Sequence, residues 1–225
     1  MSISNQIDTI SMTKKIKCLI TAGPTREHFD PVRFISNPST GKMGWNIALA
    51  AQKKGWDTTL VLGPSELPNI DGVNVVRVVS AQDMLEACQK YFDDCNILIM
   101  SAAVSDVRPA TKIEHKAKKD EIDLCPKLER TPDILKTLSK NKGDKILVGF
   151  AAETHDVLNY ANKKLAEKNL DCIAANDVSA KGCGFASTTN SIDLIFKDGS
   201  IKKFPHAEKA KIAKEMIDFF SSIFF

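Results

Sequence analysis

The fold is decided by the stretch KCLITAGP at residues 17–24 and, after a long connection, by GKMGWNIALAAQKKG at residues 41–55. The first is a short apolar run that ends at Gly23-Pro24, which is typical of a strand that stops at a turn. The second carries apolar residues at helical spacing and ends at Gly55, a natural helix stop. A strand followed by a helix is the opening unit of an α/β fold.

The same alternation continues along most of the chain. Apolar runs suited to strands are followed, after short connections, by segments with helical periodicity. We therefore expect a Rossmann-like α/β fold, with a mostly parallel sheet and helices on both faces. The expected strands are 58–62, 73–79, 97–103, 145–151 and 172–175, and the expected helices are 81–92, 132–139 and 153–168.

Three segments depart from this alternation. Residues 111–128 are charged and predict a flap or an antiparallel pair, and residues 191–204 predict a β-hairpin around Asp198-Gly199. Residues 207–220 predict a closing amphipathic helix. With no internal repeat or linker in view, we expect one domain over residues 16–225, preceded by a flexible tail at residues 1–15.

Composition narrows the class of protein. The 225 residues are 43% hydrophobic and 26% charged, which suits a folded domain with a buried core. The net charge of +3 argues against a general nucleic-acid binder. The N-terminus lacks the apolar core of a signal peptide, and no apolar run reaches the roughly 18 residues of a membrane span. We therefore expect a cytoplasmic protein.

The six cysteines give no sign of a metal site. They form no CxxC pair and none lies near a histidine at zinc-ligand spacing. Cys18 and Cys172 lie in apolar runs, so we expect buried free thiols there.

The first candidate site follows the first strand. Small residues at a helix start let backbone N–H groups and the helix dipole meet a phosphate, and residues 39–44, Ser-Thr-Gly-Lys-Met-Gly, fit that role. The stretch is neither a Walker A loop nor a GxGxxG turn. An alternative is that Gly41 and Gly44 only allow close packing of helix on strand. The connection before them is unusually long and carries Arg26, Arg33 and Asn37.

Further candidates follow later strands. Asp106, after the small residues 101–103, could accept a hydrogen bond from a ribose hydroxyl, although a simple turn explains it equally well. The lysines of residues 116–119 could form a mobile flap over phosphates, or a solvated face. Phe150 could stack on a base or belong to the core. Lys164 and Lys168 share one helix face and could neutralise a triphosphate. Asn176-Asp177 ends the next strand at the same edge.

These motifs together resemble the phosphopantothenoylcysteine synthetase family. The resemblance rests on segments that occur in order from about Cys18 to Phe196: TAGPTRE (21–27), DPVR (30–33), ISNPSTGKMG (35–44), AAVSD (102–106), KAKK (116–119), TPDI (131–134), VGFAAET (148–154) and ANDV (175–178). It implies a ligase of coenzyme A biosynthesis. The carboxylate of phosphopantothenate attacks the α-phosphate of CTP, pyrophosphate leaves, and L-cysteine then displaces CMP from the acyl-cytidylate.

The resemblance also implies roles for individual residues. Asn37 and Lys116 would be catalytic, and Lys116 would act from the flap. The substrate and its phosphate would be bound by Arg33, Ser39, Thr40, Gly41 and Lys42. The nucleotide would be bound by Met100, Ser101, Ala102, Ala103, Asp106, Thr131, Pro132, Asp133, Ile134, Phe150, Lys164 and Lys168.

The resemblance implies partners as well. Mg²⁺ would accompany CTP, with ligands that the sequence does not reveal. Arg33 matches an arginine implicated across a dimer interface, which implies a homodimer. Many relatives carry a flavin-dependent decarboxylase ahead of this domain, and here only about 16 residues precede the first strand, so we expect no flavin and a separate decarboxylase. Thr131 departs from the asparagine common in the family.

Two other functions stay open at this level. A short-chain oxidoreductase would use a Tyr-x-x-x-Lys pair, which Tyr160 and Lys164 supply, but it would also need a glycine-rich turn that the sequence lacks. A non-catalytic nucleotide-binding module would bind CTP without releasing pyrophosphate.

Overall fold

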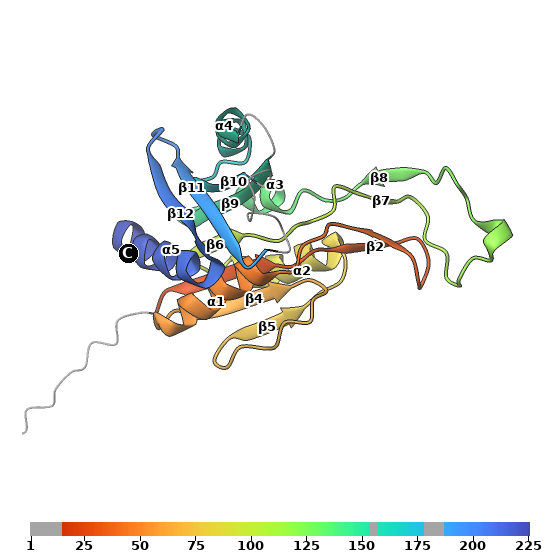
Figure 1. The fold of residues 1–225 in the computed structure, drawn as a ribbon, viewed down its shortest axis with the longest axis horizontal. Helices are drawn as coiled ribbons and strands as arrows, with labels where there is room; N and C mark the ends of the chain where they lie inside the picture. The colour runs from red at the N-terminus through yellow and green to blue at the C-terminus, as the bar shows by residue number, and fades with distance from the viewer. Residues whose placement is uncertain (1–14, 154–156, 178–186) are drawn as a thin grey trace, which may run out of the picture.

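A central sheet of eight strands organises the computed structural model, which describes residues 15–153, 157–177 and 187–225 (Figure 1). The strands from β10 to β5 pair in parallel, and β11 pairs antiparallel with both β10 and β12. Their order across the sheet is β12 (Ile201–Glu208), β11 (Thr189–Phe196), β10 (Cys172–Asp177), β9 (Ile146–Glu153), β6 (Ile97–Met100), β1 (Lys17–Ala22), β4 (Asp57–Leu62) and β5 (Asn74–Arg77).

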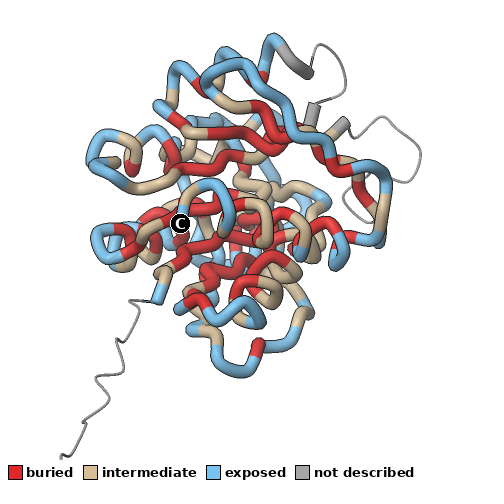
Figure 2. Tube along the Cα trace, turned by 90° about the vertical axis from the view of Figure 1, so that its left-hand side faces the viewer, coloured by how far each residue is buried: buried red, intermediate tan, exposed pale blue. Residues whose placement is uncertain are grey.

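Helices cover both faces of this sheet. On one face α1 (Lys42–Lys53) and α5 (Lys209–Phe224) pack against strand residues such as Cys18 and Ile20. On the other face α2 (Ala81–Phe92), α3 (Ile134–Ser139) and α4 (Val157–Glu167) pack against residues such as Leu19. Neighbouring strand residues serve opposite faces because successive side chains of a strand alternate. Figure 2 shows the resulting band of buried residues through the middle of the molecule.

The predicted fold class is confirmed, and most elements lie within a few residues of their expected bounds. The strand at Lys17–Ala22 and the helix at Ala81–Phe92 begin and end as expected. The helix expected from residue 153 begins at Val157, because β9 continues to Glu153 in its ladder with β10. The C-terminal hairpin and helix are present and somewhat longer than expected.

An arm projects from the edge of the sheet where the parallel strands end (Figure 1). It consists of residues 26–36 and 107–130: β2 (Arg26–His28) pairs with β3 (Phe34–Ser36), β7 (Val107–Pro109) pairs with β8 (Leu128–Arg130), and the 3₁₀ turn η1 (Lys119–Glu121) lies between β7 and β8. The antiparallel pair expected within residues 111–128 is instead formed by strands that flank this segment, β7 before it and β8 at and beyond its end.

The connection after β1, predicted as a long loop, contains a hairpin formed by β2 and β3. Its turn is closed by the buried Asp30 carboxylate, which accepts hydrogen bonds from the backbone N–H groups of Val32 (2.8 Å) and Arg33 (2.9 Å). These hydrogen bonds, from Val32 first, and the nearby Arg33 guanidinium lower the pKa of Asp30. A carboxylate that closes a turn in this way fixes the hairpin.

Several expectations concern the thiols and the ends of the chain. Cys18 and Cys172 are buried free thiols as predicted, and burial raises the pKa of the Cys88 and Cys95 thiols to about 12. Cys183 and all but the last residue of the expected tail lie outside the described residues. Among the helices of the described ranges, none combines the length and the apolar character that a membrane span requires.

Candidate active site

A cavity of about 630 Å³ opens at the edge where the parallel strands end. It is lined by the start of α1, the loop after β6, the start of α3, two lysines at the end of α4, and residues of β9, β10 and β11. An open parallel sheet binds its ligands at this edge, because strand ends and helix N-termini converge there. The cavity thus lies at the edge where the candidate residues that follow β1, β6, β9 and β10 were expected to meet.

The start of α1 forms one wall of the cavity. Ser39, Thr40, Gly41 and Lys42 all line it, and Gly41 adopts a left-handed backbone (φ 77°). The helix has no side-chain cap and no acidic residue in its first turn. Its first N–H groups are therefore available to an anion, which helix N-termini bind well.

Gly44 has a different role from Gly41. A Cβ at Gly44 would lie 2.6 Å from Ala22 Cβ and 2.8 Å from Thr21 O, and closer still to Ser101 Oγ. Only a glycine lets α1 approach β1 and the loop after β6 this closely. The packing explanation therefore holds for Gly44, whereas Gly41 combines a positive φ with a place in the cavity wall.

The loop after β6 forms the floor and is held by hydrogen bonds from both sides. Asn37 Nδ2 donates to the carbonyl oxygens of Ala103 (3.2 Å) and Val104 (3.0 Å). Ser101 Oγ donates to Thr21 O (2.8 Å). The predicted catalytic amide thus lies directly on the predicted nucleotide-binding loop, between the walls of α1 and α3.

The start of α3 and the end of α4 form the opposite wall. Asp133 caps α3 by accepting from Lys136 N (3.0 Å), and its carboxylate also pairs with Lys168 Nζ (3.0 Å). Thr131 donates its N–H to Asp106 O and its hydroxyl to Ser105 O. This threonine therefore ties the wall to the floor by two hydrogen bonds.

Positive charge predominates around the cavity. Asp106 and Asp133 are the carboxylates among the described lining residues, whereas the cations are Lys42, Arg130, Lys136, Lys164, Lys168 and Lys209. A cavity lined in this way favours polyanions, because low-dielectric walls concentrate the field of the charges. No group of three or more His, Cys, Asp or Glu side chains suited to holding a metal occurs within the described ranges.

Two predicted site residues lie outside the cavity lining. Arg33 and Lys116 belong to the arm, where Arg33 Nη2 donates to Ala117 O (2.9 Å) and pairs with Asp30 (3.4 Å). The exposed Lys116 precedes the buried Ala117. All the other predicted site residues line the cavity, although this placement does not test the role of any of them.

Two buried polar residues of the lining are not among the site residues predicted from the sequence. Asn190 (4% exposed) is the second residue of β11 in the C-terminal hairpin, and Lys209 (6% exposed) is the first residue of α5. One signal was available for Lys209, since it continues the apolar stripe of Ile212, Ala213 and Met216 at helical spacing. A lysine at such a position is unusual and marks a buried charge.

A family model provides the decisive comparison. The model for the DNA/pantothenate metabolism flavoprotein C-terminal domain matches residues 13–223. The chain belongs to this family.

The coenzyme A biosynthesis bifunctional protein CoaBC of Bacillus subtilis (strain 168) is 48% identical over 200 residues, which are 88% of this chain and 49% of that protein. The chain thus spans about half the length of the curated relatives it matches. The crystal structure of the C-terminal domain of a CoaBC protein is 42% identical, with a TM-score of 0.79 over 92% of this chain and 95% of that one. The DNA/pantothenate metabolism flavoprotein of Streptococcus pneumoniae, 22% identical, shares the fold with a TM-score of 0.78 over 92% of this chain and 99% of that one.

The positions of Tyr160 and Lys164 do not support the short-chain oxidoreductase alternative. Tyr160 is 42% exposed and is not among the lining residues of the cavity, although Lys164 is. The Tyr-x-x-x-Lys pair is therefore not assembled at the site.

Proposed function

We propose that this domain is a phosphopantothenate–cysteine ligase that uses CTP. The carboxylate oxygen of phosphopantothenate attacks the α-phosphorus of CTP, and the bond to the leaving pyrophosphate breaks. The cysteine amine then attacks the carbonyl carbon of the acyl-cytidylate. The carbon–oxygen bond breaks, CMP leaves, and the amine proton passes to the surroundings. Activation is needed because a free carboxylate is a poor electrophile.

One observation carries this proposal: the cavity has cationic walls on both sides of the sheet edge, and Asn37 lies between them. The reaction brings together two anionic substrates, a triphosphate and a phosphate monoester. Lys164 and Lys168 lie on the α4 side, and Ser39 to Lys42 lie on the α1 side. We assign the triphosphate to the first group and the acid to the second, so that the reacting groups meet above the loop after β6.

Asn37 is assigned to the second half-reaction. Its amide N–H groups point at the floor of the cavity, and a shift of this side chain would let them bind the acyl carbonyl oxygen. A donor fixed near an oxygen that gains charge accelerates acyl transfer. The preorganised floor also holds the acyl-cytidylate in place until cysteine arrives.

The described residues are compatible with Mg²⁺ bound through the nucleotide. Mg²⁺ keeps several water ligands and commonly binds through phosphates with one or two carboxylates, so a dedicated protein cage is not required. Asp106, whose side chain is at the exposed rim of the cavity, would supply a carboxylate. The ion would supply neutralisation of charge on the triphosphate.

We further propose a homodimer that pairs through the arm. The arm exposes large apolar side chains, including Val32 (56%), Ile113 (38%) and Leu124 (88%). Exposed apolar surface of this kind is suited to an interface, and a second copy of the chain would cover it. Dimerisation would bring Arg33 to the interface, and the Lys116 flap would act on bound phosphates from there. Flavin-dependent decarboxylation is not assigned to the matched residues 13–223.

The test is pyrophosphate release from phosphopantothenate and Mg²⁺ with either CTP or ATP, each with and without L-cysteine. We expect multiple turnovers only when cysteine is present, and faster turnover with CTP. Folded protein that binds CTP but releases no pyrophosphate would be a binding module and not a ligase. Analytical ultracentrifugation of the wild type and of Leu124→Asp tests the dimer: a monomeric wild type would contradict it.

A further inference from the structure

Lys209 and Asn190 form a buried polar pair in the cavity wall that no motif of the sequence singled out. Lys209 is 6% exposed, Asn190 is 4% exposed, and both line the cavity. Helix α5, which begins with Lys209, lies on the same face of the sheet as α1, whereas α3 and α4 cover the opposite face. Lys209 therefore belongs to the α1 side of the cavity, and Asn190 lies on β11, a strand that contacts both α5 and α4.

Helices α1 and α5 direct their N-termini at this side together. The two helices lie side by side and in the same direction, as the ion pair between Lys54, just after α1, and Asp218 in the second half of α5 shows (2.7 Å). Lys42 and Lys209, their first residues, both line the cavity. Neither helix has a side-chain hydrogen bond at its cap, and the positive ends of both dipoles add to the charge of the two lysines. At α5 the N-cap residue is the exposed Glu208, and the Lys209 N–H donates to Thr188 O (3.0 Å), so the N–H groups open to an anion are those of α1.

Burial makes the Lys209 charge effective inside the cavity. A charge surrounded by protein is screened much less than one in water, so its field extends further into a cavity that it faces. The Asn190 amide adds hydrogen-bonding capacity beside it. A compact group with several oxygens and two negative charges matches this combination of ammonium, amide and helix N–H groups.

We propose that Lys209 and Asn190 complete, with the first turn of α1, the subsite for the phosphate monoester of the acid substrate. The inference rests on the proposed function and deepens it, since it names the residues that distinguish the phosphorylated acid from the same acid without its phosphate. The triphosphate is held on the opposite wall, so Lys209 acts on the acid and not on the nucleotide.

The test compares phosphopantothenate with pantothenate as the acid, measured as pyrophosphate release with CTP. Lys209→Met keeps the buried alkyl chain and removes the charge. We expect it to lower kcat/KM for phosphopantothenate by at least about tenfold, as loss of a buried charged contact does, while kcat/KM for pantothenate and KM for CTP change little. Lys209→Arg should keep most of the preference.

Lys211→Met is the matched control. Lys211 lies on the same helix with a side chain that is 68% exposed, and its removal should leave the preference for the phosphorylated acid unchanged. If Lys209→Met does not fold, Asn190→Asp serves instead, since it keeps the shape and places a negative charge beside the phosphate. We expect it to reduce the same preference by at least about tenfold.

Three results would overturn the inference: an equal loss with both acids, an effect confined to KM for CTP, or an unchanged preference in both Lys209→Met and Asn190→Asp. Failure of the proposed function is a separate outcome, in which the wild type releases no pyrophosphate with either acid. Calorimetric titration with inorganic phosphate would then decide the matter, because weaker binding by Lys209→Met than by wild type still supports a phosphate subsite, and equal binding contradicts it.

Discussion

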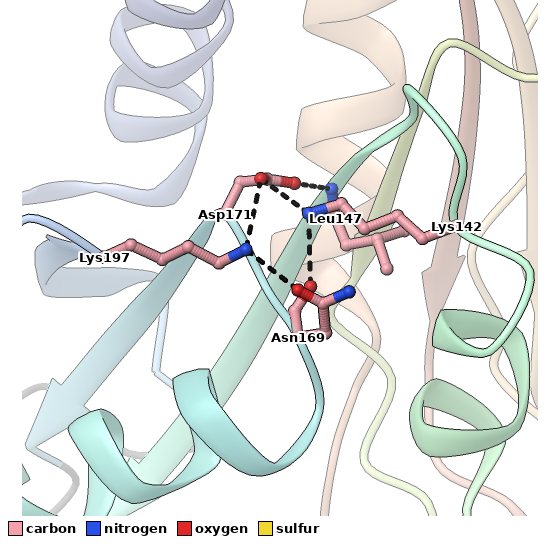
Figure 3. Close-up of polar contacts among 5 residues, drawn as sticks. All are labelled: Lys142, Leu147, Asn169, Asp171 and Lys197. Atoms are coloured by element: carbon pink, nitrogen blue, oxygen red, sulfur yellow. Dashed lines mark hydrogen bonds and ion pairs between the residues drawn. The ribbon is translucent and has the colours of Figure 1, made fainter.

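Figure 3 shows the amino edge of the sheet, where Lys142 and Lys197 lie beside one carboxylate, Asp171. At the opposite edge Lys42, Lys164 and Lys209 line the cavity. Lys142 Nζ is 2.6 Å from Asp171 Oδ1 and also donates to Asn169 O (3.2 Å). Lys197 donates to Asn169 Oδ1 (3.0 Å), and burial together with the neighbouring Lys142 lowers its pKa.

The lysines at the amino edge stabilise the fold, whereas we expect those at the cavity edge to bind substrates. Asp171 also accepts a hydrogen bond from Leu147 N (2.7 Å), so the amino-edge cluster joins the ends of β9, β10 and the C-terminal hairpin. The cluster holds two lysines and one carboxylate, and each of these three side chains is bound to partners within the fold. Around the cavity the cations outnumber the carboxylates of the described lining, and a polyanionic ligand would restore the balance. Substitutions at the two edges should therefore affect different quantities.

The largest effect is expected at the centre of the cavity. Asn37→Ala should reduce steady-state turnover by roughly 100- to 1,000-fold, the usual loss for one donor to a developing oxyanion. Pyrophosphate release in the first turnover should survive, so the acyl-cytidylate should accumulate and be detectable by mass spectrometry. Asn46→Ala, which removes an amide on α1 bound only to Lys42 O, is the control. Loss of the first turnover would show that Asn37 acts earlier than we propose.

The next largest effect concerns the arm. Lys116→Ala should lower kcat by roughly 10- to 100-fold if the flap brings this ammonium onto the phosphates during the reaction. Lys127→Ala removes an exposed lysine of the same arm and should change kcat by less than about twofold. Stopped-flow measurement of pyrophosphate release gives the rate for both variants. Equal rates would show that Lys116 takes no part in the reaction.

A smaller effect is expected on the nucleotide wall. Lys168→Met should raise KM for CTP by about tenfold, because it removes a charge facing the triphosphate, and should leave KM for cysteine unchanged. Lys163→Met, on the same helix with a side chain that is 69% exposed, is the matched control. An increase in KM for phosphopantothenate alone would reverse our assignment of the two walls.

The smallest effect on activity is expected at the amino edge. Lys142→Met should lower the free energy of unfolding by about 1–3 kcal/mol, because the half-buried Asp171 loses its closest cation. It should change kcat/KM by less than about twofold. Lys140→Met, an exposed neighbour, should alter neither quantity. Urea denaturation and steady-state kinetics on the same samples make the comparison, and a loss of activity without a loss of stability would break the distinction between the edges.

The sequence predicted the fold well where local pattern and tertiary structure agree. Apolar periodicity located β1 and α2 to the residue, because each carries its own start and stop signals, such as Gly23-Pro24 after β1 and the Ser80 cap before α2. The hairpin in the long connection was missed because a single buried carboxylate, Asp30, closes it. Such a contact leaves no periodic pattern in the sequence.

Some residues that line the cavity were predicted from the sequence and others were not. Residues that directly follow parallel strands were found, because topology alone brings strand ends together. Lys209 and Asn190 were missed, because their place depends on β11 and β12 extending the sheet beyond β10 and on α5 returning beside α1. Arg33 and Lys116 were predicted from resemblance, and the arm carries both away from the cavity of their own chain.

The most direct test of the acyl-cytidylate mechanism follows a carboxylate oxygen of phosphopantothenate through the reaction. Phosphopantothenate labelled with ¹⁸O in its carboxylate is turned over with CTP and L-cysteine, and the nucleotide product is analysed by mass spectrometry. If the carboxylate attacks the α-phosphorus and cysteine then breaks the carbon–oxygen bond, CMP must carry one ¹⁸O. Formation of CDP, or label in inorganic phosphate, would mean attack at the γ-phosphorus and would contradict the acyl-cytidylate mechanism.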